Sequence, residues 1–220
     1  MSKKTYVLGV TGGVGAGKST VLNELKETYG AYVIQADEVG RRLRLPGMPI
    51  YNWMLSKYGS QVLKPDKTID SARVAEIAFR DEISTARINE ASHPLIREAI
   101  LEEIRGMEGG TKLIALEAAL LSEGNLLDLC DSVWYIYVPR ETRILRLMET
   151  RGYSRERCAS VIRRQKTDKA FRAEADHVLR NDGTPEKLKK RIARLCAGIF
   201  SEIEQDPGIH PCPENITVDQ

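Results

Sequence analysis

The sequence predicts an α/β fold with a mostly parallel β-sheet, on the evidence of two patterns. Short apolar runs of strand length alternate along the chain with segments whose apolar residues recur at helical spacing. The first of these runs leads directly into a glycine-rich loop, and a helical segment follows that loop. Strands and helices that alternate in this way form a sheet with helices on both faces. Ligands of such sheets bind beyond the carboxyl ends of the strands.

The first elements of the pattern are a strand, a loop, a helix and a second strand. Residues 6–10 predict a buried strand that runs into the glycine-rich loop. The helix after the loop is expected to stop at Gly30, since glycine is the usual residue just beyond a helix end. Residues 31–34 predict the second strand, and the next helix is expected from Asp37 to just before 45–49, where two prolines break it.

Residues 50–107 contain no clear strand pattern. One helix is expected around 53–58 and another around 74–79, and a third opens at 92–94 with an apolar face that continues to Ile104. A helical block of this length between strands predicts an insertion into the core.

Strand patterns return in the second half of the chain. Residues 112–116 and 133–138 predict two strands, with arginine-rich helices over 141–172. A short final strand is expected at 176–179. The last helix is expected over 184–203, because Thr-Pro is a favourable start and a sustained apolar stripe follows.

Composition indicates a globular protein with one core that carries insertions. The chain has 220 residues, 42% hydrophobic and 29% charged, which excludes a disordered or fibrous protein. Lysine and arginine number 33 against 31 acidic residues, and this near-neutral sum argues against binding of nucleic acid through overall charge.

Targeting and cysteine patterns favour a cytoplasmic protein. No run of 18 apolar residues occurs, and the N-terminal apolar run is too short for a signal peptide. The spacing of the four cysteines matches neither a zinc site nor a disulfide framework, which fits a reducing compartment. We expect a monomer that binds a small-molecule substrate and contacts neither a membrane nor nucleic acid.

Basic residues concentrate between residues 140 and 172. Eleven lysines and arginines and four acidic residues give this segment a charge of +7, so the rest of the chain carries −5. The segment is either a solvated helical face or a patch that meets a polyanionic substrate, and the charge count alone does not choose between them.

The glycine-rich loop is the strongest signal of function. Residues 12–19 satisfy G-x-x-x-x-G-K-[ST], in which backbone N–H groups and a helix N-terminus cradle phosphate oxygens. Lys18 is expected to reach the β- and γ-phosphates, and the Ser19 hydroxyl to hold Mg²⁺. The residues expected to bind the phosphates of ATP are Gly13, Val14, Gly15, Ala16, Gly17, Lys18, Ser19 and Thr20. The motif predicts a nucleoside triphosphate site and leaves the reaction open.

Asp37 is the candidate group on the acceptor side. It follows the second strand, at the edge where the sheet binds ligands. Phosphoryl transfer to an alcohol needs a group that orients the hydroxyl and accepts its proton. Asp37 can fill this role or serve as the N-cap of the helix that follows, and Arg41 can pair with Asp37 or contact a substrate phosphate.

The chain resembles the dephospho-coenzyme A kinase family from residue 6 to about residue 200. The phosphate loop is generic to many kinases, whereas its combination with the motifs that follow is specific. The matching residues are Ala36-Asp37 with Arg41, Pro46-Gly47-Met48-Pro49, His93-Pro94, Leu120-Leu121 with Glu123, Arg146-Leu147, Gln165 with Lys169, Ala175-Asp176, Asn181 and Gly183.

This resemblance implies ATP-dependent phosphorylation of the ribose 3′-hydroxyl of dephospho-coenzyme A, the last step of coenzyme A synthesis. It also implies a P-loop three-layer α/β fold with a five-stranded parallel sheet, a helical substrate-binding insertion and an arginine-rich helical lid. The expected parts are a nucleotide-binding core (1–49, 108–140 and 173–205), a coenzyme A-binding insertion (50–107), a lid (141–172) and a flexible tail (206–220).

Site roles also follow from the resemblance. Asp37 is the base, with Lys18 as the second catalytic residue. Arg146 and Asn181 contact the nucleotide, and Arg41 binds the acceptor. His93 either binds the acceptor as well or is a capping or packing residue before Pro94.

Three places depart from the family pattern. Near the expected lid, the usual Arg-Asp pair appears as Thr150-Arg151, so the arginine is shifted by one residue. Gln35 replaces a second aspartate, which puts more weight on Asp37. Glu117 stands in place of an aspartate and is expected to act through Mg²⁺-bound water.

Two other functions compete with this one. The first is another nucleoside or nucleotide kinase of the same fold. The second is a P-loop switch or regulator, but the guanine-specific sequence Asn-Lys-x-Asp does not occur in the chain.

Overall fold

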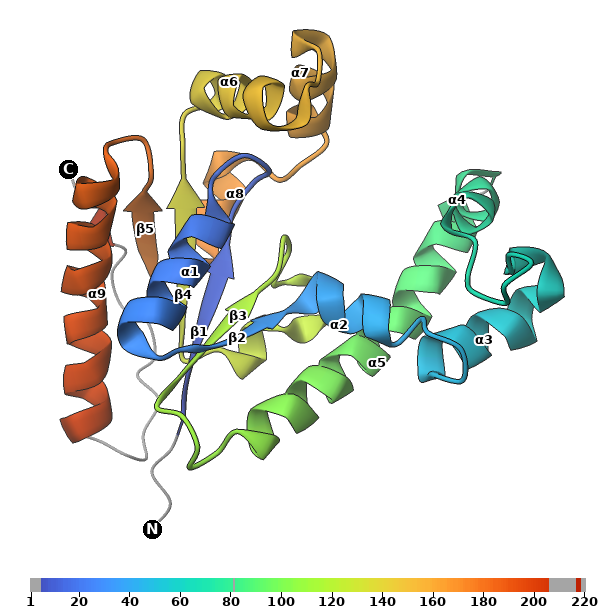
Figure 1. Ribbon diagram of the computed structural model, residues 1–220, viewed down its shortest axis with the longest axis horizontal. Helices are drawn as coiled ribbons and strands as arrows, with labels where there is room; N and C mark the ends of the chain where they lie inside the picture. The colour runs from blue at the N-terminus through green and yellow to red at the C-terminus, as the bar shows by residue number, and fades with distance from the viewer. Residues whose placement is uncertain (1–4, 81, 206–216, 219–220) are drawn as a thin grey trace. The chain divides into compact units, whose positions relative to one another are not determined.

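The computed structural model describes residues 5–80, 82–205 and 217–218 (Figure 1). The chain divides into two compact units. We call the first, Met1–Val33 with Met107–Ser122 and Leu126–Gln220, the core unit, and the second, Ile34–Gly106 with Glu123–Asn125, the insertion unit.

The described strands form a six-stranded sheet in the order β2-β3-β1-β4-β5-β6. Their bounds are β1 Tyr6–Thr11, β2 Tyr32–Gln35, β3 Leu113–Glu117, β4 Ser132–Tyr137, β5 His177–Arg180 and β6 Thr217–Val218. Strand β1 pairs in parallel with β3 and β4, and the pairs β4–β5 and β5–β6 are also parallel. The predicted α/β fold with a parallel sheet is therefore confirmed, and β6 adds a two-residue strand to the five expected.

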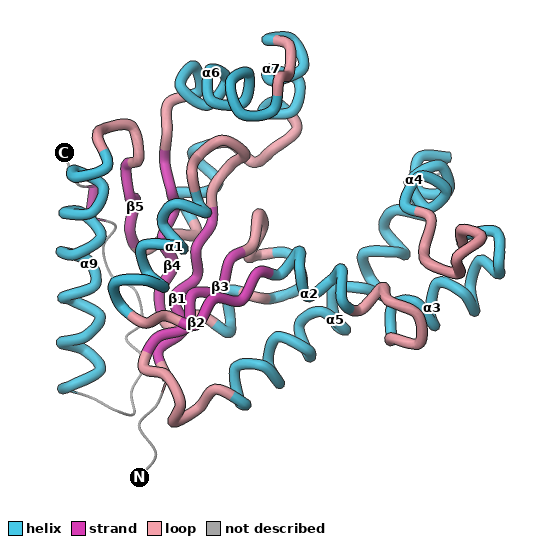
Figure 2. Tube along the Cα trace, viewed as in Figure 1, coloured by secondary structure: helices cyan, strands magenta, loops and turns pink. Residues whose placement is uncertain are grey.

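Two helices cover one face of the sheet in the core unit (Figures 1 and 2). These helices are α1 (Lys18–Tyr29) and α9 (Pro185–Gln205), and their apolar residues share one buried cluster with Trp134 and Ile136 of β4. Side chains alternate along a strand, so Tyr135 points to the opposite face. There it stacks on Phe171 of α8 (Asp168–Ala173), with ring centroids 4.9 Å apart.

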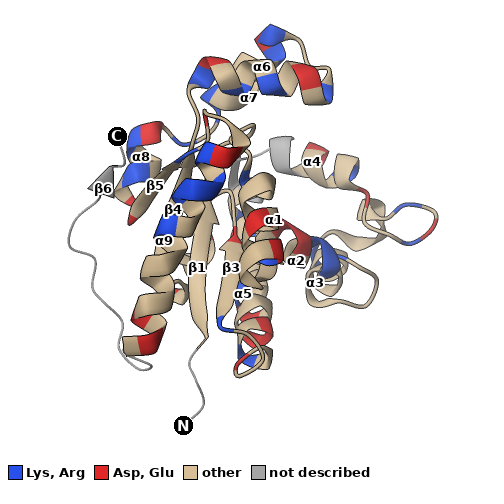
Figure 3. Cartoon of the chain, turned by 60° about the vertical axis from the view of Figure 1, so that its left-hand side comes forward, with Lys and Arg blue, Asp and Glu red and all other residues tan. Residues whose placement is uncertain are grey.

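The arginine-rich segment forms α6 (Arg140–Arg151) and α7 (Arg155–Arg163) before α8. Ile144 and Leu147 of α6 bury a small apolar cluster with Cys158 of α7. Basic and acidic residues both occur along these two helices (Figure 3). These two helices form a small layer of their own, which we call the lid.

The insertion unit is helical. Its elements are α2 (Ala36–Arg42), α3 (Pro49–Tyr58), η1 (Gly59–Val62), α4 (Ser71–Arg80), α5 (Glu82–Gly106) and the single 3₁₀ turn η2 (Glu123–Asn125). The unit begins at Ile34, before the expected insertion boundary at 50, because α2 packs against α5. A Cβ on Gly40 would lie only 3.2 Å from the Ile96 side chain, so glycine permits this close approach.

Helix α5 corrects one expectation. The third helix of the insertion starts at Glu82, not at 92–94, and Pro94 lies inside it. Proline removes one backbone hydrogen bond and usually breaks a helix. Here the buried face that includes Ile88 continues past Pro94 to Ile100 and Ile104, so packing maintains the helix through the proline.

The strand expected at 176–179 is confirmed as β5, whereas the expected tail contributes one more strand, β6. The 3₁₀ turn η3 (Leu127–Leu129) precedes β4, and β5 is followed by α9 and then by β6. Residues 206–216 and 219–220 of the expected tail lie outside the described residues, whereas Thr217–Val218 pair with β5. None of the helices in the described ranges has the length and apolar character that crossing a membrane requires.

Candidate active site

The phosphate loop connects β1 to α1 at the carboxyl edge of the sheet. Gly17 is the N-cap of α1 with a φ of 82°, a left-handed conformation that favours glycine. A Cβ at this position would also lie 2.3 Å from the Asn181 amide nitrogen. Position 17 therefore requires glycine for two reasons: the backbone is left-handed there, and Asn181 leaves no space for a Cβ atom.

Lys18 reaches back over the loop. Its Nζ donates a hydrogen bond to the Gly12 carbonyl oxygen at 2.8 Å and lies 3.5 Å from Glu117 Oε1. The next two residues, Ser19 and Thr20, are exposed in the first turn of α1. An ammonium group, two hydroxyls and the positive end of a helix dipole thus occupy one small region, which is suited to bind phosphate.

Glu117 comes to the loop from the neighbouring strand. It is the last residue of β3 and aligns with Val10 of β1 in the parallel register. Its side chain is mostly buried, with 8% of the residue exposed. Parallel strands bring their carboxyl ends to one edge, and this is why a residue 99 positions beyond Lys18 lies against it.

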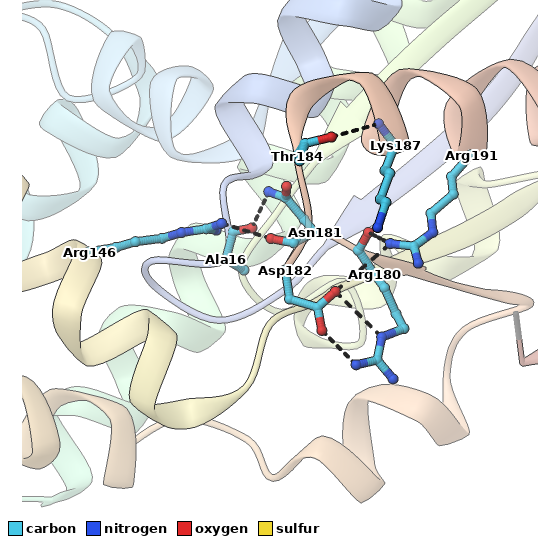
Figure 4. Close-up of polar contacts among 8 residues, drawn as sticks. All are labelled: Ala16, Arg146, Arg180, Asn181, Asp182, Thr184, Lys187 and Arg191. Atoms are coloured by element: carbon cyan, nitrogen blue, oxygen red, sulfur yellow. Dashed lines mark hydrogen bonds and ion pairs between the residues drawn. The ribbon is translucent and has the colours of Figure 1, made fainter. Parts of the chain in front are cut away.

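The two residues expected to contact the nucleotide meet at the same loop (Figure 4). Asn181 follows β5, is buried, and donates from Nδ2 to the Ala16 carbonyl oxygen at 2.8 Å. Arg146 of α6 donates from Nη2 to the Asn181 carbonyl oxygen at 2.8 Å. Hydrogen bonds therefore link three parts of the core unit in series: α6, the end of β5 and the phosphate loop.

Arg143 is a site residue that sequence reasoning missed. It lies on α6 with only 5% of its surface exposed. Its Nε donates to the Val14 carbonyl oxygen at 2.8 Å, and its Nη2 donates to Gln165 Oε1 at 2.5 Å. Burial lowers the pKa of its guanidinium from the usual value. Arg143 is one of eleven basic residues between residues 140 and 172, and nothing in the local sequence distinguishes it as the buried one.

The arginines of the +7 segment lie in two different surroundings. Arg143 and Arg146 turn toward the phosphate loop. By contrast, Arg155 is exposed and pairs with Glu141 at 2.5 Å, and Arg151 is exposed at the end of α6.

Asp37, Arg41 and His93 belong to the insertion unit. Asp37 is exposed in the first turn of α2, whose N-cap is Gln35, so the alternative in which Asp37 caps the helix is wrong. Arg41 pairs with Glu38 at 2.5 Å, one helical turn away. This contact takes the place of the pair with Asp37, one of the two alternatives for Arg41, the other being a substrate phosphate.

His93 lies in the middle of α5, so it is not a helix cap. Its Nε2 is 4.0 Å from Glu123 Oε2. Its Cβ would lie 3.0 Å from a Cβ added to Gly124, whose φ is 68°. The imidazole therefore packs on η2 within the insertion unit and is partly exposed.

The fold and the loop define the class of this protein: it is a P-loop nucleotide-binding protein, in which a lysine, a carboxylate and an arginine of α6 lie together at the carboxyl edge of a parallel sheet. The family model of dephospho-CoA kinase matches residues 6–187. The chain belongs to this family, which carries out the ATP-dependent last step of coenzyme A biosynthesis.

Individual relatives agree with this assignment. The chain is 37% identical over 188 residues to a dephospho-CoA kinase of Thermobifida fusca, a match that covers 86% of this chain and 93% of the relative. A solved structure from Thermus thermophilus is 27% identical with a TM-score of 0.75, covering 89% of this chain and 98% of that one. The fold also matches a dephospho-CoA kinase structure from Campylobacter jejuni, with 22% identity, a TM-score of 0.64, and 89% and 97% coverage.

Proposed function

We propose that this chain transfers the γ-phosphoryl group of ATP to the ribose 3′-hydroxyl of dephospho-coenzyme A, giving coenzyme A and ADP. The observation that carries the proposal is the position of Lys18, which lies between the Gly12 carbonyl and Glu117 above a phosphate loop. Family membership supports the choice of acceptor.

The loop binds the triphosphate in this proposal. The N-terminus of α1 and backbone N–H groups of the loop, other than that of Val14, which donates to Gln165, surround the β-phosphate, and Lys18 contacts the transferring γ-phosphate. Arg146 and Asn181 contact the nucleoside end, which is supported by their joint link to Ala16. Charge that develops on the phosphate oxygens during transfer is then met by donors that are already in position.

Mg²⁺ fits the residues present at the loop. It prefers oxygen ligands, and Ser19 offers an exposed hydroxyl next to Lys18. Glu117 adds a carboxylate 3.5 Å from Lys18 Nζ, which would hold the ion through a water molecule. Bound Mg²⁺ neutralises charge on the β- and γ-phosphate oxygens.

Asp37 is the proposed base. The ribose 3′-oxygen attacks the γ-phosphorus, the bond to the β–γ bridging oxygen breaks, and ADP leaves. Asp37 accepts the hydroxyl proton as the new P–O bond forms. Its exposed position in the first turn of α2, directly after a strand end, supports this role. Arg41 and His93 bind the acceptor, and the helices of residues 50–107 hold the rest of the coenzyme.

We further propose that the enzyme acts as a monomer in the cytoplasm. Cys130, Cys158 and Cys196 are free thiols, as a reducing compartment requires. The proposed roles are all filled by residues of one chain.

An acceptor assay tests the function. The purified chain is given ATP and Mg²⁺ with dephospho-coenzyme A, adenosine, AMP or no acceptor, and ADP release is measured. We expect turnover with dephospho-coenzyme A at least about 100-fold above the other conditions, because the parts of this acceptor beyond the adenosine provide further binding energy in the transition state. Faster turnover with AMP or adenosine would favour another kinase of this fold. ADP release that does not depend on any acceptor would favour a P-loop switch.

A further inference from the structure

Arg143 carries a buried charge without a role in the mechanism above. Its side chain leaves α6 on the same side as Ile144 and Leu147, and all three residues are at most 5% exposed. Removing a guanidinium from water is costly unless its donors find acceptors. Here they find two neutral oxygens, the Val14 carbonyl and the Gln165 amide.

Gln165 contacts both Arg143 and Val14. Its Oε1 accepts from Arg143 Nη2 at 2.5 Å and from the Val14 backbone N–H at 3.1 Å. Both polar groups of the Val14 peptide backbone are therefore held by Arg143 and Gln165. The Val14 side chain also packs against the lid cluster of Ile144, Leu147 and Cys158.

The loop leaves no space for a side chain where the arginine passes. A Cβ on Gly13 would lie 2.2 Å from Arg143 Nη2, and one on Gly15 would lie 3.1 Å from the Arg143 carbonyl oxygen. The guanidinium thus lies directly on the loop backbone, between Gly13 and the amide of Gln165.

We propose that Arg143 and Gln165 are positioning residues that hold Val14, and with it the phosphate loop, in the conformation that binds ATP. The inference rests on the proposed ATP site at this loop. A phosphate loop binds ATP tightly when its backbone already has the bound conformation before ATP arrives. A loop that other residues do not hold in place must be ordered on binding, and the free energy of that ordering reduces its affinity for ATP. Arg143 acts through Val14, so its removal changes ATP binding and leaves the acceptor site unaffected.

The test compares five variants of the full chain, four single substitutions and the double variant Arg143→Met with Gln165→Leu. Arg143→Met keeps the length of the side chain without its donors, and Gln165→Leu keeps the shape of the amide without its acceptor. Arg143→Lys retains the charge without the planar fork. Arg155→Met is the matched control, since it removes one exposed arginine from α7. ATP affinity is measured by calorimetry without acceptor, and melting temperature reports on folding.

We expect Arg143→Met and Gln165→Leu each to weaken ATP binding by about tenfold, the usual loss for a hydrogen bond to a charged group. The double variant should bind ATP about as weakly as either single one, because the two residues act on one peptide. Arg143→Lys should lose most of that affinity, and Arg155→Met almost none. The KM for the acceptor should stay unchanged.

ATP affinity within about twofold of the native value in folded Arg143→Met would overturn the proposal, and so would full affinity in Arg143→Lys. The proposal would also be overturned if the losses of ATP-binding free energy in the two single variants added up in the double variant, since the two residues would then act independently. Calorimetry does not involve the acceptor, so failure here is distinct from failure of the acceptor assay.

Discussion

Lys18 at the start of α1 and Glu117 at the end of β3 form an ion pair, with Nζ 3.5 Å from Oε1 and both side chains less than one-fifth exposed. The same ammonium donates to Gly12, so it is held directly above the loop. Two consequences follow. The lysine is fixed over the loop by these two contacts, and a carboxylate, the kind of oxygen ligand that Mg²⁺ prefers, lies beside it.

The first prediction concerns Lys18. Lys18→Ala removes the cation that meets the transferring phosphate, so kcat should fall by at least about 100-fold with dephospho-coenzyme A as acceptor. Circular dichroism should be unchanged, because the residue is partly exposed at the start of α1. Near-native turnover in a folded Lys18→Ala protein would remove the loop from the mechanism.

Asp37 gives the second prediction. Asp37→Asn keeps the size of the side chain and most of its hydrogen bonds but cannot accept the proton. We expect kcat to fall about 10²- to 10⁴-fold while ATP affinity stays nearly constant. Glu38→Gln is the control at the next position. If Asp37→Asn only raises the acceptor KM, Asp37 binds substrate and Glu117 becomes the next candidate for the base.

The third prediction concerns the lid. If it closes over ATP, exposed arginines such as Arg151, Arg155 and Arg163 should be protected from trypsin when ATP and acceptor are both bound. Cleavage at Lys190 of α9 serves as the reference site in the same digest. Equal cleavage of the lid with and without substrates would mean that these arginines form only a solvated face.

Asn181 provides a fourth prediction, on stability and binding together. Asn181→Leu leaves the buried Ala16 carbonyl without its donor, and this should lower the free energy of unfolding by about 1–3 kcal/mol. The KM for ATP should rise as well. Asn52→Leu removes a similar bond to Gly47 at an exposed position and should cost less than about 0.5 kcal/mol. Urea denaturation compares the two, and equal losses would contradict a special role for Asn181.

The fifth prediction concerns the thiols. Burial, with added repulsion from nearby acids, raises the pKa of Cys130 and of Cys196 to about 12. Both should therefore be unreactive toward iodoacetamide at pH 8.5 in the folded protein and reactive in urea, as read by mass spectrometry of the peptides. Fast alkylation of either residue without denaturant would contradict the burial.

The same pKa shifts predict how the free energy of unfolding changes with pH. A thiol whose folded pKa is raised contributes stability that is complete below the unfolded value near 9.0 and is lost as the pH rises toward about 12. The free energy of unfolding should thus decline between these pH values. Cys196→Ala should make the decline shallower, and an unchanged slope would assign it to other groups.

Local sequence patterns predict much of this protein. The alternation of apolar runs and helical segments predicts the parallel sheet, because strand and helix periodicities are properties of short stretches of chain. The loop motif predicts the β1–α1 connection. Gly17 is required there by a left-handed backbone conformation, and Lys18 by the position of the phosphates.

The sequence by itself thus determined the fold class, the phosphate loop and the family. The first two rest on patterns within short stretches of chain, and the family rests on the identity and order of motifs from residue 6 to about residue 200. Only the tertiary structure decided which distant residues meet. Glu117 lies against Lys18 because parallel strands share an edge, and Arg143 reaches Val14 because α6 buries one face over the loop. Helix α5 runs through Pro94 because its buried face outweighs one lost hydrogen bond, a balance that no local propensity contains.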